Sequence, residues 1–193
     1  MKWLVYIVIA LSIVGCGTAK EPTIEEQEAY NTLKSFIAEK DFTILSDYAR
    51  PQASSGLNSL QNSNILGNGN SVAGISLQGN PNYLKVTNDT ISAHLPFYGE
   101  RRIGSGFGSN GAIDFNAQPN NYKVIENDKK RAVEISFDIK GNSELYNINL
   151  TVFSNKRTTL LVTSSQRTNI EYTGKAKRTV NETLDKSNSF NYL

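Results

Sequence analysis

Few residues in this chain have side chains suited to chemistry, and the first is its single histidine, His94. Apolar and polar residues alternate over 90–97, which predicts a strand with Ser92 and His94 on its polar face. The Cβ atoms of this pair would lie about 7 Å apart, given the rise of a strand. A nucleophile and its base also need a third group that orients the base. We therefore assign no catalytic residue and expect His94 to be solvated or bonded to a turn.

The most ligand-like cluster consists of Tyr98, Arg101 and Arg102, which precede a glycine-rich stretch. Two guanidinium groups at a strand end can hold a phosphate or a carboxylate. The stretch 106–111 has the G-x-G-x-x-G spacing of dinucleotide-binding loops, but a loop precedes it and a short strand follows it. We interpret it as a glycine loop that binds no cofactor, and keep the three side chains as candidate ligand contacts.

The composition excludes several function classes. The chain has 193 residues, a formal net charge of +2, one cysteine and one histidine. A single cysteine excludes a disulfide framework and a cysteine-based zinc site, and a single histidine excludes a multi-histidine metal site. The near-neutral charge gives no broad basic field for nucleic acid. We expect no metal, no cofactor and no nucleic-acid partner.

The N-terminus has the layout of a secretory signal. Lys2 is followed by an apolar run over 3–14 that is too short to span a bilayer. The run ends at Gly15 and Cys16 in a sequence that resembles a bacterial lipobox, Ile-Val-Gly-Cys. The resemblance implies cleavage between Gly15 and Cys16, and lipid attachment at Cys16 through chains such as palmitate. Several acyl chains together anchor a protein firmly to a membrane.

The expected boundaries follow from this cleavage. Residues 1–15 form the signal peptide and residues 16–22 the tether after the lipidated cysteine. The predicted location is the cell envelope, lipid-anchored and either periplasmic or surface-facing. Gly17 after Cys16 resembles outer-membrane sorting, so the outer membrane is favoured.

Residues 23–175 predict a single β-rich domain. Thr23 and Glu26 have the spacing of a capping box, and the apolar period predicts an amphipathic helix over 24–40. Alternating segments between turn signals predict strands. They are 42–49, 74–78, 83–86, 90–97, 112–116, 122–126, 133–139, 146–152, 158–164 and 169–173.

The fold class expected from these elements is mostly β (α+β), an antiparallel meander of about eight strands with one N-terminal amphipathic helix. The sheet must close as a barrel-like or a sandwich-like structure, and the sequence does not separate the two. Residues 54–82 are rich in Asn, Ser and Gly and predict a long loop, and 176–193 predict a polar C-terminal tail.

One further site lies at a predicted turn. Asp89-Thr90-Ile91 resembles the acceptor of O-linked glycans in some bacterial envelope proteins, and a transferase could reach Thr90 there. We keep Thr90 as a candidate acceptor.

Four segments, in this order, resemble domain-of-unknown-function family 4251, a group of small bacterial envelope lipoproteins. They are Asp47-Tyr48-Ala49-Arg50-Pro51, Asn82-Tyr83-Leu84, His94-Leu95-Pro96-Phe97-Tyr98-Gly99 and Arg167-Thr168-Asn169-Ile170-Glu171-Tyr172-Thr173-Gly174. The resemblance covers about residues 30–175 and implies an envelope location and a mostly β domain. It brings no activity and no catalytic residues.

The functional expectation is an envelope lipoprotein that acts as a non-enzymatic binding or assembly module. Its expected partners are the membrane, through acylated Cys16, and either another envelope protein or a small ligand. One alternative is a carrier that holds a small apolar or saccharide ligand in a barrel cavity, favoured by a pocket lined with Phe, Tyr and Leu. A second alternative is a weak hydrolase that uses polar residues of a strand face.

Overall fold

The computed structural model describes residues 23–54, 59, 70–71, 73–102, 111–141 and 144–179 of the chain. Its elements are α2 (Ile24–Ala38), β1 (Asp41–Pro51), β2 (Ile75–Ser76), β3 (Tyr83–Thr87), β4 (Thr90–Leu95), β5 (Ile113–Ala117), β6 (Asn120–Asn127), β7 (Ala132–Lys140), β8 (Leu145–Phe153), β9 (Arg157–Ser164) and β10 (Ile170–Arg178). Gly15, Cys16 and the rest of the predicted signal and tether lie outside the described residues, as do the glycine loop over 103–110 and most of the loop predicted over 54–82.

Helix α2 begins as its sequence predicts. The Thr23 hydroxyl accepts a hydrogen bond from the Glu26 backbone amide at 3.3 Å, and the Glu26 carboxylate accepts one from the Thr23 amide at 3.0 Å. These two bonds form the capping box. The helix ends at Ala38, two residues before the predicted end, because Lys40 has a left-handed φ of 50° that turns the chain into β1.

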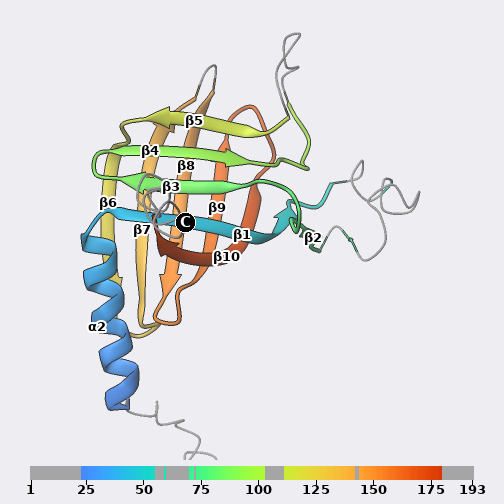
Figure 1. Cartoon of the computed structure of the whole chain (residues 1–193). Helices are drawn as coiled ribbons and strands as arrows, with labels where there is room; N and C mark the ends of the chain where they lie inside the picture. Colours follow the sequence, from blue (N-terminus) through green and yellow to red (C-terminus); the bar gives the residue numbers. More distant parts are fainter. Residues whose placement is uncertain are drawn as a thin grey trace, which may run out of the picture.

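The sheet is antiparallel throughout and curls into a half-barrel (Figure 1). Nine strands follow one another in the order β5-β4-β3-β1-β10-β9-β8-β7-β6, and β2 pairs with β1 beside them. The predicted fold class is confirmed. The edge strands β5 and β6 are joined only through Gln118 and Pro119, so the sheet must bend to bring its two ends together.

The position of β1 in the sheet differs from the predicted meander. The neighbours of β1 are β3 and β10, so the first strand of the chain lies inside the sheet and pairs with the last strand. That pairing carries β10 through Arg178, with Ala176 opposite Ile44 and buried. Residues 176–178, predicted as the start of the polar tail, therefore belong to this strand.

The sheet bends at a β-bulge in β1, between Ser46 and Tyr48. Gly174 lies opposite Ser46, where a Cβ atom would overlap the carbonyl oxygen of Leu45. The Asn82 amide holds the bulge from β3's side: it accepts a hydrogen bond from the Ser46 amide at 2.8 Å and donates one to the Ser46 carbonyl at 3.0 Å. Three of the segments that carry the family resemblance therefore meet at this bend.

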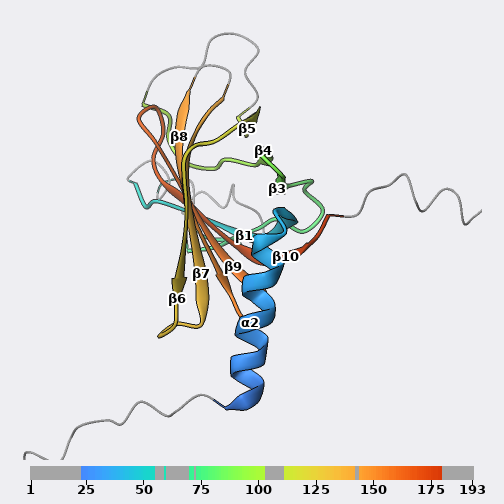
Figure 2. The same cartoon turned by 90° about the vertical axis from the view of Figure 1, so that its left-hand side faces the viewer.

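Among the described residues, one cluster of buried side chains fills the concave side of the sheet. Figure 2 shows α2 and strands β3–β5 on the same side of β6–β9, so the two halves of the sheet and the helix enclose this core. The helix contributes Tyr30, Leu33, Phe36 and Ile37. Among the described residues, no helix is long and apolar enough to cross a membrane.

Candidate functional site

An open groove of about 780 Å³ crosses the outer face of the sheet. We call it the outer groove. It is lined by Asp47, Tyr48, Lys130, Phe153, Ser154, Asn155, Arg157, Thr158, Thr159, Thr173, Gly174 and Lys175.

The strand register explains which side chains project into this groove. Thr159 pairs with Thr173, which in turn pairs with Tyr48, so these three residues form one row across β9, β10 and β1. Arg157 pairs with Lys175 and forms the neighbouring row. The groove crosses three inter-strand spacings from β8 to β1, about 14 Å in all.

The β-bulge determines which side chains of β1 line the groove. An extra residue at the bulge lets two successive side chains, Asp47 and Tyr48, both be exposed. The Tyr48 side chain is 51% exposed, which is high for an aromatic residue. The groove therefore has an aromatic wall on β1 and a second aromatic side chain, Phe153, at the end of β8.

The charges of the groove are mostly positive. Lys130, Arg157 and Lys175 line it together with one carboxylate, Asp47. Lys130 forms an ion pair with Glu134 at 3.3 Å. Within the part of the chain that the structure describes, Arg157 and Lys175 form no ion pair with any carboxylate. Two like charges thus face each other across neighbouring strands, which costs stability when nothing bridges them.

The sequence did not predict this site, because its residues come from four strands and two turns. Tyr48 and Thr173 belong to segments of the family resemblance, but nothing in either segment indicates that the two side chains are neighbours. The one available signal was the cation pattern at the ends of two predicted strands, Arg157 and Lys175.

The predicted ligand cluster lies elsewhere, beside the loop between β9 and β10. Arg101 forms an isolated β-bridge with Arg167, and the Arg102 amide donates a hydrogen bond to the Gln166 carbonyl at 2.8 Å. Tyr98 packs against the core, and its hydroxyl accepts a hydrogen bond from the Asn80 amide at 3.3 Å. The role of Tyr98, Arg101 and Arg102 as ligand contacts therefore stays a prediction.

Next to this segment lies a buried ion pair that the sequence did not predict. The side chains of Glu144 and Arg167 are each 5% exposed, and Arg167 Nε lies 2.8 Å and 3.0 Å from the two carboxylate oxygens of Glu144. The hydroxyls of Ser164 and Tyr146 also donate to Glu144, the latter at 2.9 Å. The guanidinium lies 5.0 Å from the Phe97 ring centre.

This network holds three loop ends together rather than offering a reactive group. Burial would raise the pKa of the Glu144 carboxyl, but hydrogen bonds from Ser164, Arg167 and Tyr146 outweigh it and lower the pKa. Burial raises the pKa of the Tyr146 hydroxyl to about 12. Arg167 also donates to the Gly111 carbonyl at 2.8 Å, so its donors are used within the fold.

His94 lies on the polar side of β4, as predicted, and has a partner there. Its Nδ1 atom is 2.5 Å from the Asp114 carboxylate, which lies directly opposite on β5. Both side chains are about two-fifths exposed, at 39% and 40%. Within the described residues, the Ser92 hydroxyl makes no hydrogen bond with His94, so the orienting group is in place but no nucleophile is joined to it.

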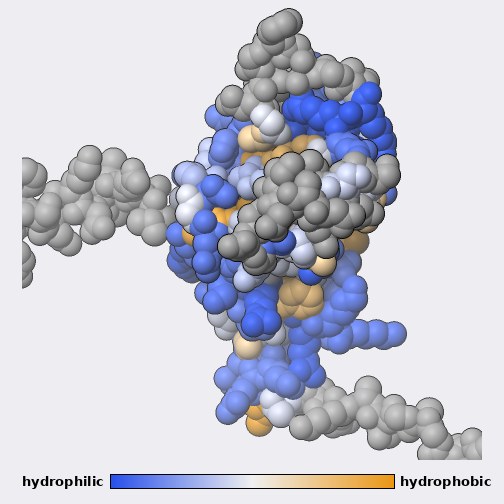
Figure 3. All heavy atoms as spheres, turned by 90° about the vertical axis from the view of Figure 1, so that its right-hand side faces the viewer, coloured by the Kyte–Doolittle hydropathy of each residue, from blue (hydrophilic) through white to orange (hydrophobic). Residues whose placement is uncertain are grey.

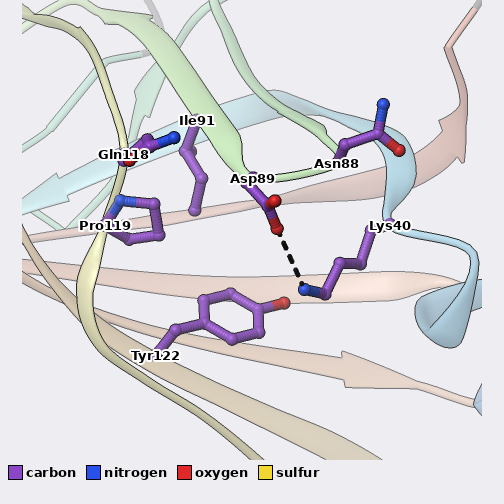
Figure 4. A pocket seen from close by; sticks show the side chains of 7 residues that line it. All are labelled: Lys40, Asn88, Asp89, Ile91, Gln118, Pro119 and Tyr122. Atoms are coloured by element: carbon purple, nitrogen blue, oxygen red, sulfur yellow. Dashed lines mark hydrogen bonds and ion pairs between the residues drawn. The ribbon is translucent and has the colours of Figure 1, made fainter.

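Thr90 is exposed at the start of β4. Its two chain neighbours, Asp89 and Ile91, line a smaller pocket of about 240 Å³ (Figure 4). Asp89 lies in this pocket and forms an ion pair with Lys40 at 3.5 Å. The Lys40 ammonium also lies 5.5 Å from the centre of the Tyr122 ring. The predicted acceptor is thus on an accessible turn, and its modification stays a prediction. No cluster of His, Cys, Asp and Glu that could hold a metal ion occurs among the described residues.

Comparison with known proteins places the domain in a family. A family model described as "Domain of unknown function (DUF4251)" matches residues 24–176. The crystal structure of a DUF4251 family protein from Bacteroides eggerthii is similar, with a TM-score of 0.50 at 13% sequence identity. The match covers 86% of this chain and 95% of that one, and at this identity it shows the fold alone. None of the curated proteins matches.

Proposed function

We propose that this chain, which belongs to the DUF4251 family, is a lipid-anchored protein of the bacterial cell envelope and acts as a non-enzymatic binding module. The observation that carries the proposal is the contrast between the two faces of the sheet. Buried side chains fill the concave side, whereas the convex side has the outer groove. The groove is lined by cations, hydroxyl groups and an exposed aromatic side chain, which can bind a polar partner.

The lining of the outer groove favours a polar partner over an apolar one. On the face drawn in Figure 3, hydrophobic atoms form small separate areas between hydrophilic ones. A continuous apolar patch is typical of a permanent protein interface. The filled core also gives no support to the carrier alternative, which needs a cavity inside the sheet.

The envelope location rests on the sequence at Gly15 and Cys16. Its test is growth of the native bacterium, or of a host with a lipoprotein pathway, with an alkyne-tagged fatty acid. We expect the full chain to take up the label and to sediment with the membranes, and Cys16→Ser to lose the label. An unlabelled chain of full length would contradict the lipoprotein assignment.

The hydrolase alternative keeps one supporting observation, the carboxylate of Asp114 against His94. A carboxylate in that position fixes the histidine tautomer, as in catalytic triads. If this pair is catalytic, His94→Ala removes hydrolysis of any ester that the wild-type chain cleaves, and equal rates for both proteins would eliminate the alternative.

A further inference from the structure

We propose that the outer groove binds an acidic oligosaccharide, with its oxyanion held between Arg157 and Lys175 and a sugar ring on Tyr48. The inference deepens the proposed binding function and rests on it. It concerns a site to which neither the family nor the fold assigns a ligand.

The charge arrangement indicates an anion. Arg157 and Lys175 lie directly opposite each other on β9 and β10, on the solvent face, and have no carboxylate partner among the described residues. Cross-strand partners have Cβ atoms about 5 Å apart, so their cationic groups can reach one oxyanion together. A guanidinium also presents two parallel donors to a carboxylate, sulfate or phosphate.

Asp47 favours a ligand whose negative charge lies away from β1. This carboxylate lines the opposite side of the groove, on β1, and forms no ion pair within the described residues. A densely charged polyanion would be repelled there. A ligand with one oxyanion near β9 and hydroxyl groups near β1 would instead meet a cation pair at one end and a hydrogen-bond acceptor at the other.

The remaining lining residues fit a sugar. Thr159 and Thr173 offer hydroxyls along the floor, and Ser154 and Asn155 add polar groups at the end formed by the β8–β9 turn. Tyr48 is half exposed and can present its ring to the apolar face of a sugar while its hydroxyl stays in water. A groove about 14 Å long accommodates a short oligosaccharide better than a single small ion.

The test is a calorimetric titration of the full chain, solubilised in a non-ionic detergent. The probes are carboxylated, sulfated and phosphorylated trisaccharides, with maltotriose as the neutral control and inorganic phosphate as the bare anion. We expect at least one acidic trisaccharide to bind about tenfold more tightly than maltotriose and than phosphate, the gain typical of one charge-assisted hydrogen bond. Added salt should weaken this binding.

Substitutions locate the binding within the groove. Arg157→Gln and Lys175→Gln should each weaken binding of the acidic trisaccharide about tenfold, and Tyr48→Ala should weaken both the acidic and the neutral sugar. Lys140→Gln is the matched control, because Lys140 is an exposed cation at the far end of β7. All four residues are exposed, so each variant should still fold, and a cooperative melting transition checks this.

Three results would overturn the proposal. The first is no binding by any of the three acidic trisaccharides, and the second is binding that Lys140→Gln weakens as much as Arg157→Gln does. The third is binding to phosphatidylglycerol vesicles, lost in Arg157→Gln, without binding to any soluble trisaccharide, which would assign the groove to lipid headgroups. The trisaccharide titrations do not depend on lipidation, so their failure is distinct from failure of the Cys16 labelling experiment.

Discussion

The buried pair of Glu144 and Arg167 allows a stability prediction that can be worked out from its contacts. Glu144→Gln keeps the shape of the side chain but removes its charge. The Arg167 guanidinium, 5% exposed, then loses the carboxylate that it contacts through Nε at 2.8 Å and 3.0 Å. The hydroxyls of Ser164 and Tyr146 also lose a charged acceptor.

Removing one partner of a buried ion pair costs about 3–5 kcal/mol, because the other charge stays buried without compensation. For a domain of this size the loss corresponds to roughly 6–20 °C in Tm. The measurement is thermal and urea unfolding followed by circular dichroism at pH 7. The matched control is Glu171→Gln, whose exposed ion pair with Arg50, at 2.7 Å, contributes less than about 1 kcal/mol.

The pH dependence of unfolding gives an independent check. Because the folded-state pKa of Glu144 lies below its ordinary value of 4.5, this carboxylate stabilises the fold above that pH. The contribution is lost as the pH falls from 4.5 through the lowered pKa, and Glu144→Gln should remove that part of the acid sensitivity. The free energy of unfolding of Glu171→Gln should lie within about 1 kcal/mol of the wild-type value. The same result for Glu144→Gln would refute the reasoning.

Further predictions concern the bend, the helix and the groove. Gly174→Ala should lower the free energy of unfolding by about 1–3 kcal/mol or more in urea titrations, because its Cβ would overlap the Leu45 carbonyl. Thr23→Ala should lose about 1 kcal/mol of stability and some far-ultraviolet helix signal, because the capping box is broken. Arg157→Gln should raise the Tm slightly at low salt, since it removes the repulsion from Lys175, and the gain should shrink in high salt. A lower Tm at low salt would show that the two cations do not repel in the folded protein.

Local features of the fold could be predicted from the sequence because each depends on neighbouring residues. The capping box at Thr23 is a relation over three residues, and the alternation in β7 and β8 is a relation over two. These signals gave the helix and the strands to within a few residues. The end of α2 was placed too late, because a left-handed φ at Lys40 has no signature in the apolar period.

Long-range pairing could not be predicted in the same way. The place of β1 between β3 and β10 joins residues more than a hundred positions apart, such as Ile44 and Ala176. Nothing in a period of two specifies which strand lies next to which. Glu144 and Arg167 were missed for a related reason: each is a charged residue between two strands, and only the fold brings them together and buries them.

The bulge in β1 connects the curvature of the sheet to the proposed site. The extra residue between Ser46 and Tyr48 bends the strand, and Gly174 on β10 permits that close approach. The same extra residue exposes both Asp47 and Tyr48 on the outer face, where they form one wall of the outer groove. Gly174→Ala should therefore weaken ligand binding as well as folding, because the wall and the bend depend on one backbone irregularity. If the variant folds and binds the acidic trisaccharide as tightly as wild type, Tyr48 is placed by something other than the bulge.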